Sequence, residues 1–251
     1  MIKHSAAWWC FVRDGVMDGE TFVRTCADLG YDGIELPPTE AFAMIRNAGL
    51  AISGISGHQS IASGLNRREN HDRIVGEIEA SLELAVRWQI PALICFSGER
   101  QGLDDAAGAA ATIDGLRRLA PLAEQAGVAL VLELLNSRVD HPDYQCDHVE
   151  WGVGVIQAVA SPRIKLLYDI YHAQIMDGHL IATIRQHNAQ FGHYHTAGNP
   201  GRHEIDDTQE INYPPVIAAI RATGYDGWLA QEFVPVGETT AALRDALRRC
   251  Q

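Results

Sequence analysis

Residues 128–133 read Val-Ala-Leu-Val-Leu-Glu, an apolar run that stops at the carboxylate Glu133. A short continuous apolar run is typical of a strand buried on both faces of a parallel sheet. Three later runs stop at a polar residue in the same way: 164–168 at Asp169, 191–194 at His195 and 228–231 at Glu232. In a parallel α/β barrel the strands end at one rim, which carries the chemistry. These four runs therefore predict such a rim.

The rest of the chain repeats the alternation of strand and helix. Four earlier apolar runs cover residues 4–9, 33–36, 51–55 and 92–96. Between the runs lie segments of period 3.6, such as Ile74–Trp88, in which Ile74, Ile78, Leu82, Ala85 and Val86 predict one buried face. The junction GYDGIEL at 30–36 is echoed by GYDGWLA at 224–230, which predicts the same helix-to-strand turn in a repeated unit.

Eight such units without a Pro/Gly/Ser-rich linker predict one domain over residues 1–251 that closes into a (β/α)8 TIM barrel. An open doubly wound sheet is the alternative, but no Gly-x-Gly-x-x-Gly follows the first run. The four longest loops, 56–68, 97–105, 134–147 and 196–212, all follow predicted strands. In a barrel they would crowd the same rim as the four polar residues.

Composition and charge argue against nucleic-acid and membrane partners and indicate where the protein works. The formal net charge is −12, so binding to nucleic acid is not expected. The apolar stretches are shorter than the roughly 20 residues that span a bilayer, so no membrane partner is expected either. Five scattered cysteines without a Cys-x-x-Cys pair, and an N-terminus unlike a signal peptide, predict a cytoplasmic protein with reduced thiols.

Three carboxylates and one imidazole at neighbouring strand ends suggest a site for one divalent metal ion. Any one of them could simply bond nearby backbone, but four in consecutive strands favour a shared cation, because buried acids without a partner are costly. Oxygen ligands with a single imidazole suit Mg²⁺, Mn²⁺ or Co²⁺, with Zn²⁺ left open. The predicted metal ligands are Glu133, Asp169, His195 and Glu232.

Other residues near the predicted rim have two interpretations each. His172 follows Asp169 by three residues and could be either a substrate contact or a helix-capping histidine. His193 should share a face with His195, which favours a hydrogen-bonded interior residue. His58, after the third strand, could form a polar wall for substrate or part of a plain turn. Trp8 and Trp9 could line a sugar-sized pocket, although one of them is more simply core.

From residue 131 to residue 233 the chain resembles the hydroxypyruvate isomerase branch of the xylose-isomerase-like barrel superfamily, which also contains ketose 3-epimerases. The matching stretches are 132–136 (LELLN), 168–178 (YDIYHAQIMDG), 200–204 (PGRHE) and 231–233 (QEF). The resemblance implies the four metal ligands named above, with Glu133 and Glu232 as the acid/base pair. It also implies that His172 and Arg202 contact substrate oxygens.

Two positions depart from the isomerase or the epimerase pattern. Isomerases of this branch tend to carry glutamine where this chain has His195, whereas the epimerases carry histidine. An epimerase glutamate has no counterpart, since Val139 occupies that region. We therefore expect an aldose–ketose isomerase, an intramolecular oxidoreductase, with a ketose 3-epimerase as the alternative. An inosose dehydratase, an apurinic-site endonuclease and a non-catalytic carbohydrate-binding barrel are weaker alternatives.

The expected substrate is a small carbohydrate or hydroxy-keto acid such as hydroxypyruvate. Interconverting a 2-ketone and an aldehyde moves a proton between adjacent carbons, and a metal chelated by the two oxygens would stabilise the enediolate. Two carboxylates on opposite sides of the substrate could exchange that proton. The fork of Arg202 could hold a substrate carboxylate. Assembly into a homo-oligomer is left open.

Overall fold

The computed structural model of the chain describes residues 1–251, which divide into two units. Unit 1 contains Met1–Gly54, His179–Asn188 and Tyr194–Gln251. Unit 2 contains Ile55–Gly178 and Ala189–His193. Strand β8 (Phe191–Thr196) contributes its first three residues to unit 2 and its last three to unit 1. The prediction of one domain over the whole chain is not tested by this division and stays a prediction.

Unit 1 is built on parallel strands in the order β3-β2-β1-β9-β8. Besides the end of β8, these are β1 (Lys3–Ala7), β2 (Gly33–Glu35), β3 (Ala51–Ile52) and β9 (Trp228–Gln231). Ala7 pairs with Glu35, and Gln231 pairs with Thr196. The carboxyl ends of β2, β1, β9 and β8 therefore lie level at one edge of this sheet.

Helices flank the strands of unit 1. They are α1 (Trp8–Phe11), α2 (Gly19–Leu29), η1 (Thr39–Ala41), α3 (Phe42–Asn47), α8 (Leu180–His187), α9 (Tyr213–Ala222) and α10 (Thr239–Cys250). Phe11 stacks on Phe22 at 5.5 Å between ring centroids and meets Phe233 edge-on at 5.1 Å. These rings pack residues far apart in sequence behind the ends of β1 and β9. The short η3 (Asn188–Gln190) leads into β8.

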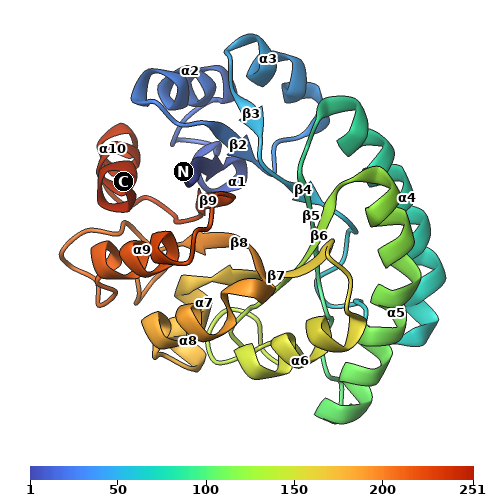
Figure 1. Ribbon diagram of the computed structural model, residues 1–251. Helices are drawn as coiled ribbons and strands as arrows, with labels where there is room; N and C mark the ends of the chain where they lie inside the picture. Colours follow the sequence, from blue (N-terminus) through green and yellow to red (C-terminus); the bar gives the residue numbers. More distant parts are fainter. The chain divides into compact units, whose positions relative to one another are not determined.

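Unit 2 contains four parallel strands in the order β4-β5-β6-β7. They are β4 (Ile55–Ser56), β5 (Ala92–Cys95), β6 (Ala129–Glu133) and β7 (Ile164–Asp169). The helical segments are η2 (Arg68–Asn70), α4 (His71–Trp88), α5 (Asp105–Ala126), α6 (Val149–Val159) and α7 (Ile170–Met176). Figure 1 shows α4 and α5 side by side along β5 and β6. Apolar side chains from both helices pack on these strands.

Two predicted strands need correction. Trp8 and Trp9 do not extend the first strand but begin helix α1, where the Trp8 ring packs edge-on against Phe22 at 5.8 Å. The third predicted strand breaks at Ser53 and Gly54, so that β3 pairs with β2 and β4 pairs with β5. At the break, the Ser53 hydroxyl donates to Ser5 Oγ at 2.8 Å.

The repeated junction is confirmed as a helix-to-strand turn. Gly30 and Gly224 both have positive φ, 87° and 81°, and a strand begins three or four residues later in each case. The predicted buried face of α4 is confirmed at Ile74, Ile78 and Leu82, among others. Val86 is the exception, with 55% of its surface exposed. Ala85, in the same turn, is buried, so the buried face of α4 does not extend to the neighbouring position 86.

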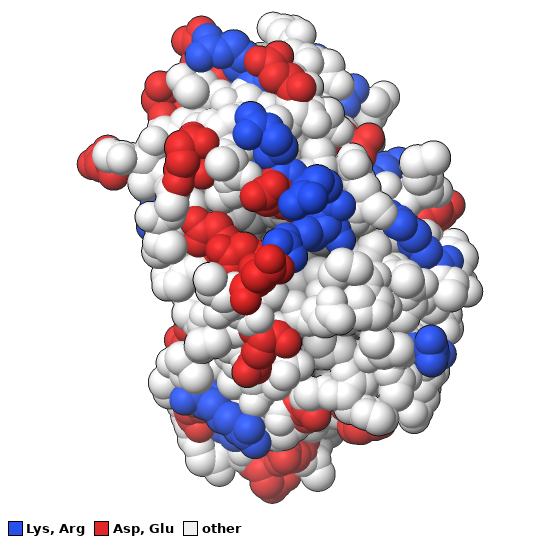
Figure 2. Space-filling model, turned by 90° about the vertical axis from the view of Figure 1, so that its left-hand side faces the viewer, with Lys and Arg blue, Asp and Glu red and all other residues white.

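The surface carries charges of both signs. On the face drawn in Figure 2, acidic and basic side chains lie next to one another among uncharged residues. No helix has the length and apolar character needed to cross a membrane. The five cysteines are buried free thiols.

Candidate functional site

Three buried polar residues stand at the strand ends of unit 1. Glu35 is the last residue of β2, His195 is the next-to-last residue of β8, and Glu232 directly follows β9. Glu35 and His195 are fully buried, and Glu232 is 4% exposed. Because the strands are parallel and end level, the sheet places these side chains together.

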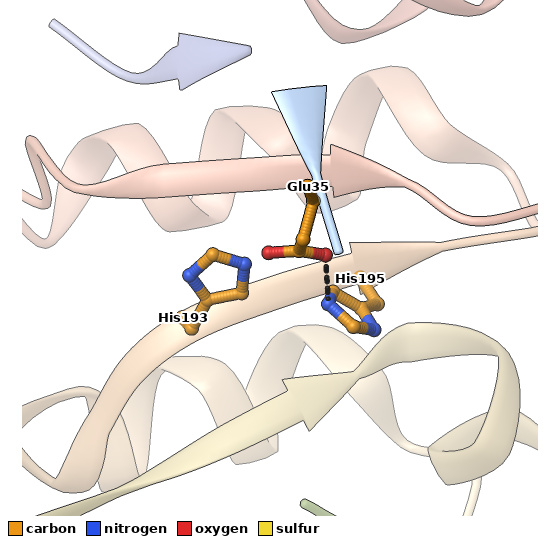
Figure 3. A group of neighbouring side chains, drawn as sticks. All are labelled: Glu35, His193 and His195. Carbon is orange, nitrogen blue, oxygen red and sulfur yellow. Dashed lines mark ion pairs between the residues drawn. The ribbon is translucent and has the colours of Figure 1, made fainter. Parts of the chain in front are cut away.

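The imidazole of His195 lies between two carboxylates. Its Nδ1 is 2.9 Å from Oε2 of Glu232, and its Nε2 is 2.7 Å from Oε2 of Glu35. Figure 3 shows the Glu35 contact, and shows His193 projecting from the same strand as His195. Residues two apart on a strand point to the same face, which is why the two histidines were predicted to share one face of β8. Both are buried. Both ring nitrogens of His195 therefore face negative charge.

Glu232 receives hydrogen bonds on both of its carboxylate oxygens. Trp9 Nε1 donates to Oε1 at 2.9 Å, and Arg202 Nη2 donates to Oε2 at 2.6 Å. Burial by itself raises the pKa of this carboxyl, but the charges of His195 and Arg202 outweigh burial and lower the pKa well below its ordinary value. Glu232 is therefore a carboxylate at neutral pH.

Arg202 is held by backbone geometry and by an aromatic ring. Arg202 has a φ of 57°, and Gly201 before it has a φ of 96°. The loop after β8 therefore makes a tight turn at these two residues. The guanidinium carbon lies 5.3 Å from the ring centroid of Trp9. A cation over an indole face is attracted by about 0.5–2 kcal/mol, depending on how far it is desolvated. Trp9 and Arg202 thus support each other beside Glu232.

Two of the predicted ligands lie on adjacent strands of unit 2. Glu133 is the last residue of β6 and Asp169 the last residue of β7, and the register pairs Glu133 with Leu167. Asp169 also caps helix α7, because its Oδ1 accepts the backbone N–H groups of Tyr171 and His172. This cap fixes the direction of the carboxylate at the strand end.

His172 is oriented by Asn136, a residue of the loop after β6. Its Nδ1 accepts from the backbone N–H of Asn136 at 3.1 Å and lies 2.6 Å from the amide Nδ2 of the same residue. Asn136 in turn donates to Asp140, which also accepts from the Tyr171 hydroxyl. Because Nδ1 accepts, the proton of the neutral ring sits on Nε2, 3.7 Å from Asp169 Oδ2. The predicted substrate contact is therefore a hydrogen-bond donor.

His58 has a structural contact in unit 2. Its Nε2 accepts the backbone N–H of Phe96 at 2.9 Å, and only 2% of the residue is exposed. Burial lowers the pKa of His58 to about 4, so the ring is neutral at ordinary pH. A contact between His58 and substrate stays a prediction.

Three residues of these networks were not predicted. Glu35 lies inside the predicted apolar run 33–36, and an acid within such a run is the signal that could have identified it. Asn136 carries no such signal. Trp9 was considered only as a pocket wall, and its contact with Glu232 spans 223 residues of sequence.

A sequence profile of the family described as xylose isomerase-like TIM barrel matches residues 23–250. The chain belongs to this family. The predicted (β/α)8 TIM barrel fold is thereby confirmed. A crystal structure of a Brucella melitensis protein, described as a family 2 AP endonuclease, superposes on this xylose isomerase-like chain with a TM-score of 0.84, at 28% identity and over 97% of each chain.

Curated relatives add isomerases to the comparison. A 2-oxo-tetronate isomerase of Cupriavidus necator is 34% identical over 131 residues, which are 52% of this chain and 50% of the relative. The hydroxypyruvate isomerase of Escherichia coli is 33% identical over 135 residues, 54% of this chain and 52% of the relative. The xylose isomerase-like chain spans about half the length of the curated relatives that it matches. The resemblance to the hydroxypyruvate isomerase branch is confirmed.

Proposed function

We propose that the protein is a metal-dependent aldose–ketose isomerase of the hydroxypyruvate isomerase type. Its substrate would be hydroxypyruvate, 2-oxo-tetronate or a similar small hydroxy-carbonyl compound. The names of the curated relatives support the reaction class. The observation that carries the proposal is Glu232, a buried carboxylate at a strand end that accepts from Trp9 and Arg202 and lies beside the imidazole of His195.

We propose that Glu133, Asp169, His195 and Glu232 hold one divalent metal ion. The chemistry of the set, three carboxylates and an imidazole from strand ends, suits Mg²⁺, Mn²⁺ or Co²⁺, with Zn²⁺ as a further candidate. Asp169 has its carboxylate direction fixed by the cap of α7, and His195 has Nδ1 directed at Glu232. A bound metal would act as a Lewis acid that stabilises the negative oxygen formed when a carbon loses its proton.

Glu133 and Glu232 are the proposed acid/base pair. An ionised carboxylate is the form that accepts a proton, and the donors around Glu232 keep it in that form. Each such group contributes about 10²–10⁴-fold to a reaction rate. In this proposal one glutamate removes the proton α to the carbonyl, and the other assists its return to the neighbouring carbon.

His172 and Arg202 are the proposed substrate contacts, with His58 as a third. The Nε2–H of His172 would donate to a substrate oxygen, because Asn136 occupies the opposite nitrogen. Arg202 has five N–H donors. Its Nη2 donates to the Glu232 carboxylate and its Nε to the Glu232 carbonyl, and its other N–H groups suit a carboxylate or a pair of hydroxyls on the substrate. These contacts suit a small anionic or hydroxyl-rich substrate.

A ketose 3-epimerase on the same scaffold is the second candidate, favoured by His195 at a position where the isomerases tend to carry glutamine. Val139, exposed at 64%, stands where the epimerases carry a glutamate and argues against it. An inosose dehydratase and a carbohydrate-binding barrel without activity are weaker candidates. The latter would bind sugar equally well after Glu133→Gln.

The test is a panel of three- to six-carbon ketoses and hydroxy-keto acids with protein loaded with each metal in turn. The proposal expects conversion of hydroxypyruvate to the corresponding aldehyde, or of 2-oxo-tetronate to its 3-oxo isomer. Epimerisation at carbon 3 of a ketose would favour the second candidate. Turnover in heavy water should place deuterium on carbon. Glu133→Gln and Glu232→Gln should each abolish most activity. Products free of deuterium at early conversion, together with active variants, would instead indicate a hydride shift.

We further propose that the protein works in the cytoplasm on small molecules, without a nucleic-acid or membrane partner. Fractionation of cells that express it tests the location. Light scattering coupled to gel filtration measures whether it forms a homo-oligomer. Binding of duplex DNA at low salt would contradict the partner proposal.

A further inference from the structure

Glu35 is a buried acid to which neither the proposed chemistry nor the predicted ligand set gives a role. It is fully buried at the end of β2, and its Oε2 lies 2.7 Å from Nε2 of His195. A carboxylate in such a position is costly unless a cation or a donor faces it. Its position therefore requires an explanation beyond packing.

The two ring nitrogens of His195 face different carboxylates. Nε2 faces Glu35, whereas Nδ1 faces Glu232 at 2.9 Å. A histidine that binds a metal uses one nitrogen as the ligand and keeps a proton on the other, and the partner of that proton sets the ring orientation. Since Glu232 belongs to the proposed ligand set, Nδ1 is the nitrogen on the ligand side.

Glu35 itself is held in place from the same unit. Its Oε1 lies 3.4 Å from the Ser53 hydroxyl, which donates to Ser5 Oγ at 2.8 Å. Ser5 is on β1, next to β2, and the register pairs Ala7 with Glu35. The carboxylate therefore contacts Ser53, in the break after β3, and Ser53 in turn contacts Ser5 of β1.

We propose that Glu35 is a positioning residue that holds the Nε2 edge of His195 and so presents Nδ1 as a metal ligand beside Glu232. The inference rests on the proposed metal site. It makes two separate statements: the carboxylate keeps the proton on Nε2, and this arrangement strengthens metal binding. In the alternative, Glu35 and Nε2 would both be ligands, and Nδ1 would not.

The first statement is tested without activity, by ¹⁵N NMR of the full chain labelled at histidine, with His195→Gln to identify the His195 signals. Metal-free protein should show a protonated Nε2, and Glu35→Ala should shift that signal. On addition of Zn²⁺, which is diamagnetic, the wild-type spectrum should show Nδ1 bound and Nε2 still protonated. A metal-bound Nε2, or an Nε2 signal that Glu35→Ala leaves unchanged, would overturn the proposal.

The second statement is tested by the dissociation constants for Mn²⁺ and Zn²⁺, measured by competition with a chelator. Loss of a residue that orients a metal-binding histidine typically weakens affinity about 10–100-fold, and we expect this range for Glu35→Ala. Glu35→Gln keeps an oxygen that can accept from Nε2–H and should lose less. Asp32→Asn is the control, because it removes a carboxylate that only accepts from the His4 backbone in the same unit.

The outcomes separate this inference from the proposed function. If wild-type protein binds no metal, the metal site and the second statement fail together, whereas the Nε2 signal still decides the first. If metal binds and Glu35→Ala and Glu35→Gln both bind as tightly as wild type, the positioning role is wrong and the metal site stands. Circular dichroism of each metal-free variant checks folding. If the alanine variant does not fold, the isosteric Glu35→Gln variant is used for the test instead.

Discussion

The indole Nε1–H of Trp9 donates to Oε1 of Glu232 at 2.9 Å, while its ring lies under the guanidinium of Arg202. Trp9 thus touches both Glu232, the proposed proton acceptor, and Arg202, which is proposed to bind the substrate. Trp9 is 39% exposed, so it is not a core residue. The contact exists only because α1 turns the chain at the end of β1.

Trp9→Phe should lower kcat/KM roughly tenfold, because a hydrogen bond to a charged group is worth about 1.5–3 kcal/mol and only part of it need be specific to the transition state. The ring over Arg202 would be retained. Steady-state kinetics on the substrate found by the panel measure the effect.

Trp8→Phe is the matched control, because Trp8 packs on Phe22 and Gly19 of α2 instead. It should lower the thermal midpoint and leave kcat/KM close to wild type. Equal kinetic losses in the two variants would argue against a specific role for Trp9.

Arg202→Lys should lower kcat/KM, since a single ammonium cannot donate to Glu232 and also offer a planar fork to substrate. We expect kcat/KM to fall about tenfold or more. If Arg202 contacts a carboxylate of the substrate remote from the reacting carbons, the change should appear as a higher KM. Arg221→Lys is the control, because Arg221 donates to the carbonyl of Cys250 and has no contact with Glu232. Unchanged kinetics for Arg202→Lys would remove Arg202 from the substrate site.

Asp169→Asn should reduce metal content, because a neutral amide replaces one of three anionic ligands. Metal analysis after dialysis at matched protein concentration gives the readout. Asp177→Asn serves as the control, since Asp177 also caps a helix, through the backbone N–H of Val149, but is not a proposed ligand. Equal occupancy in wild type and Asp169→Asn would count against the four-ligand site.

His58 predicts a pH dependence of stability. Burial lowers its pKa from 6.5 to about 4, so the unfolded chain takes up a proton first as the pH falls. The free energy of unfolding should therefore decrease between about pH 6.5 and about pH 4, by at most about 3–4 kcal/mol from this group. Above pH 6.5 this contribution is fully present.

Urea unfolding of His58→Gln tests this, because the glutamine oxygen can accept from Phe96 N–H but does not titrate in this range. Its stability should change less than that of wild type between pH 7 and pH 4.5. His58→Asn, which is too short to reach the same N–H, should be less stable at every pH. A parallel decrease for wild type and His58→Gln would show that another group is responsible.

Sequence patterns by themselves determined the order of strands and helices, because buried strands need apolar runs and covering helices need a period of 3.6. They also determined that Glu133, Asp169, His195 and Glu232 stand at strand ends, since a run that stops at a polar residue marks the end of a strand. The type of residue then indicated metal chemistry. Local pattern sufficed for these features because each depends on residues close together in the chain.

Tertiary structure alone decided which partner each polar group has. The contacts of His195 with Glu35 and of Glu232 with Trp9 join segments separated by 160 and 223 residues, and no local pattern encodes them. The break of the third strand at Ser53 and Gly54 likewise depends on which neighbour each half pairs with. Hydrogen bonds and charge pairing need positions within about 3 Å, and such positions are set only when the strands are packed in register.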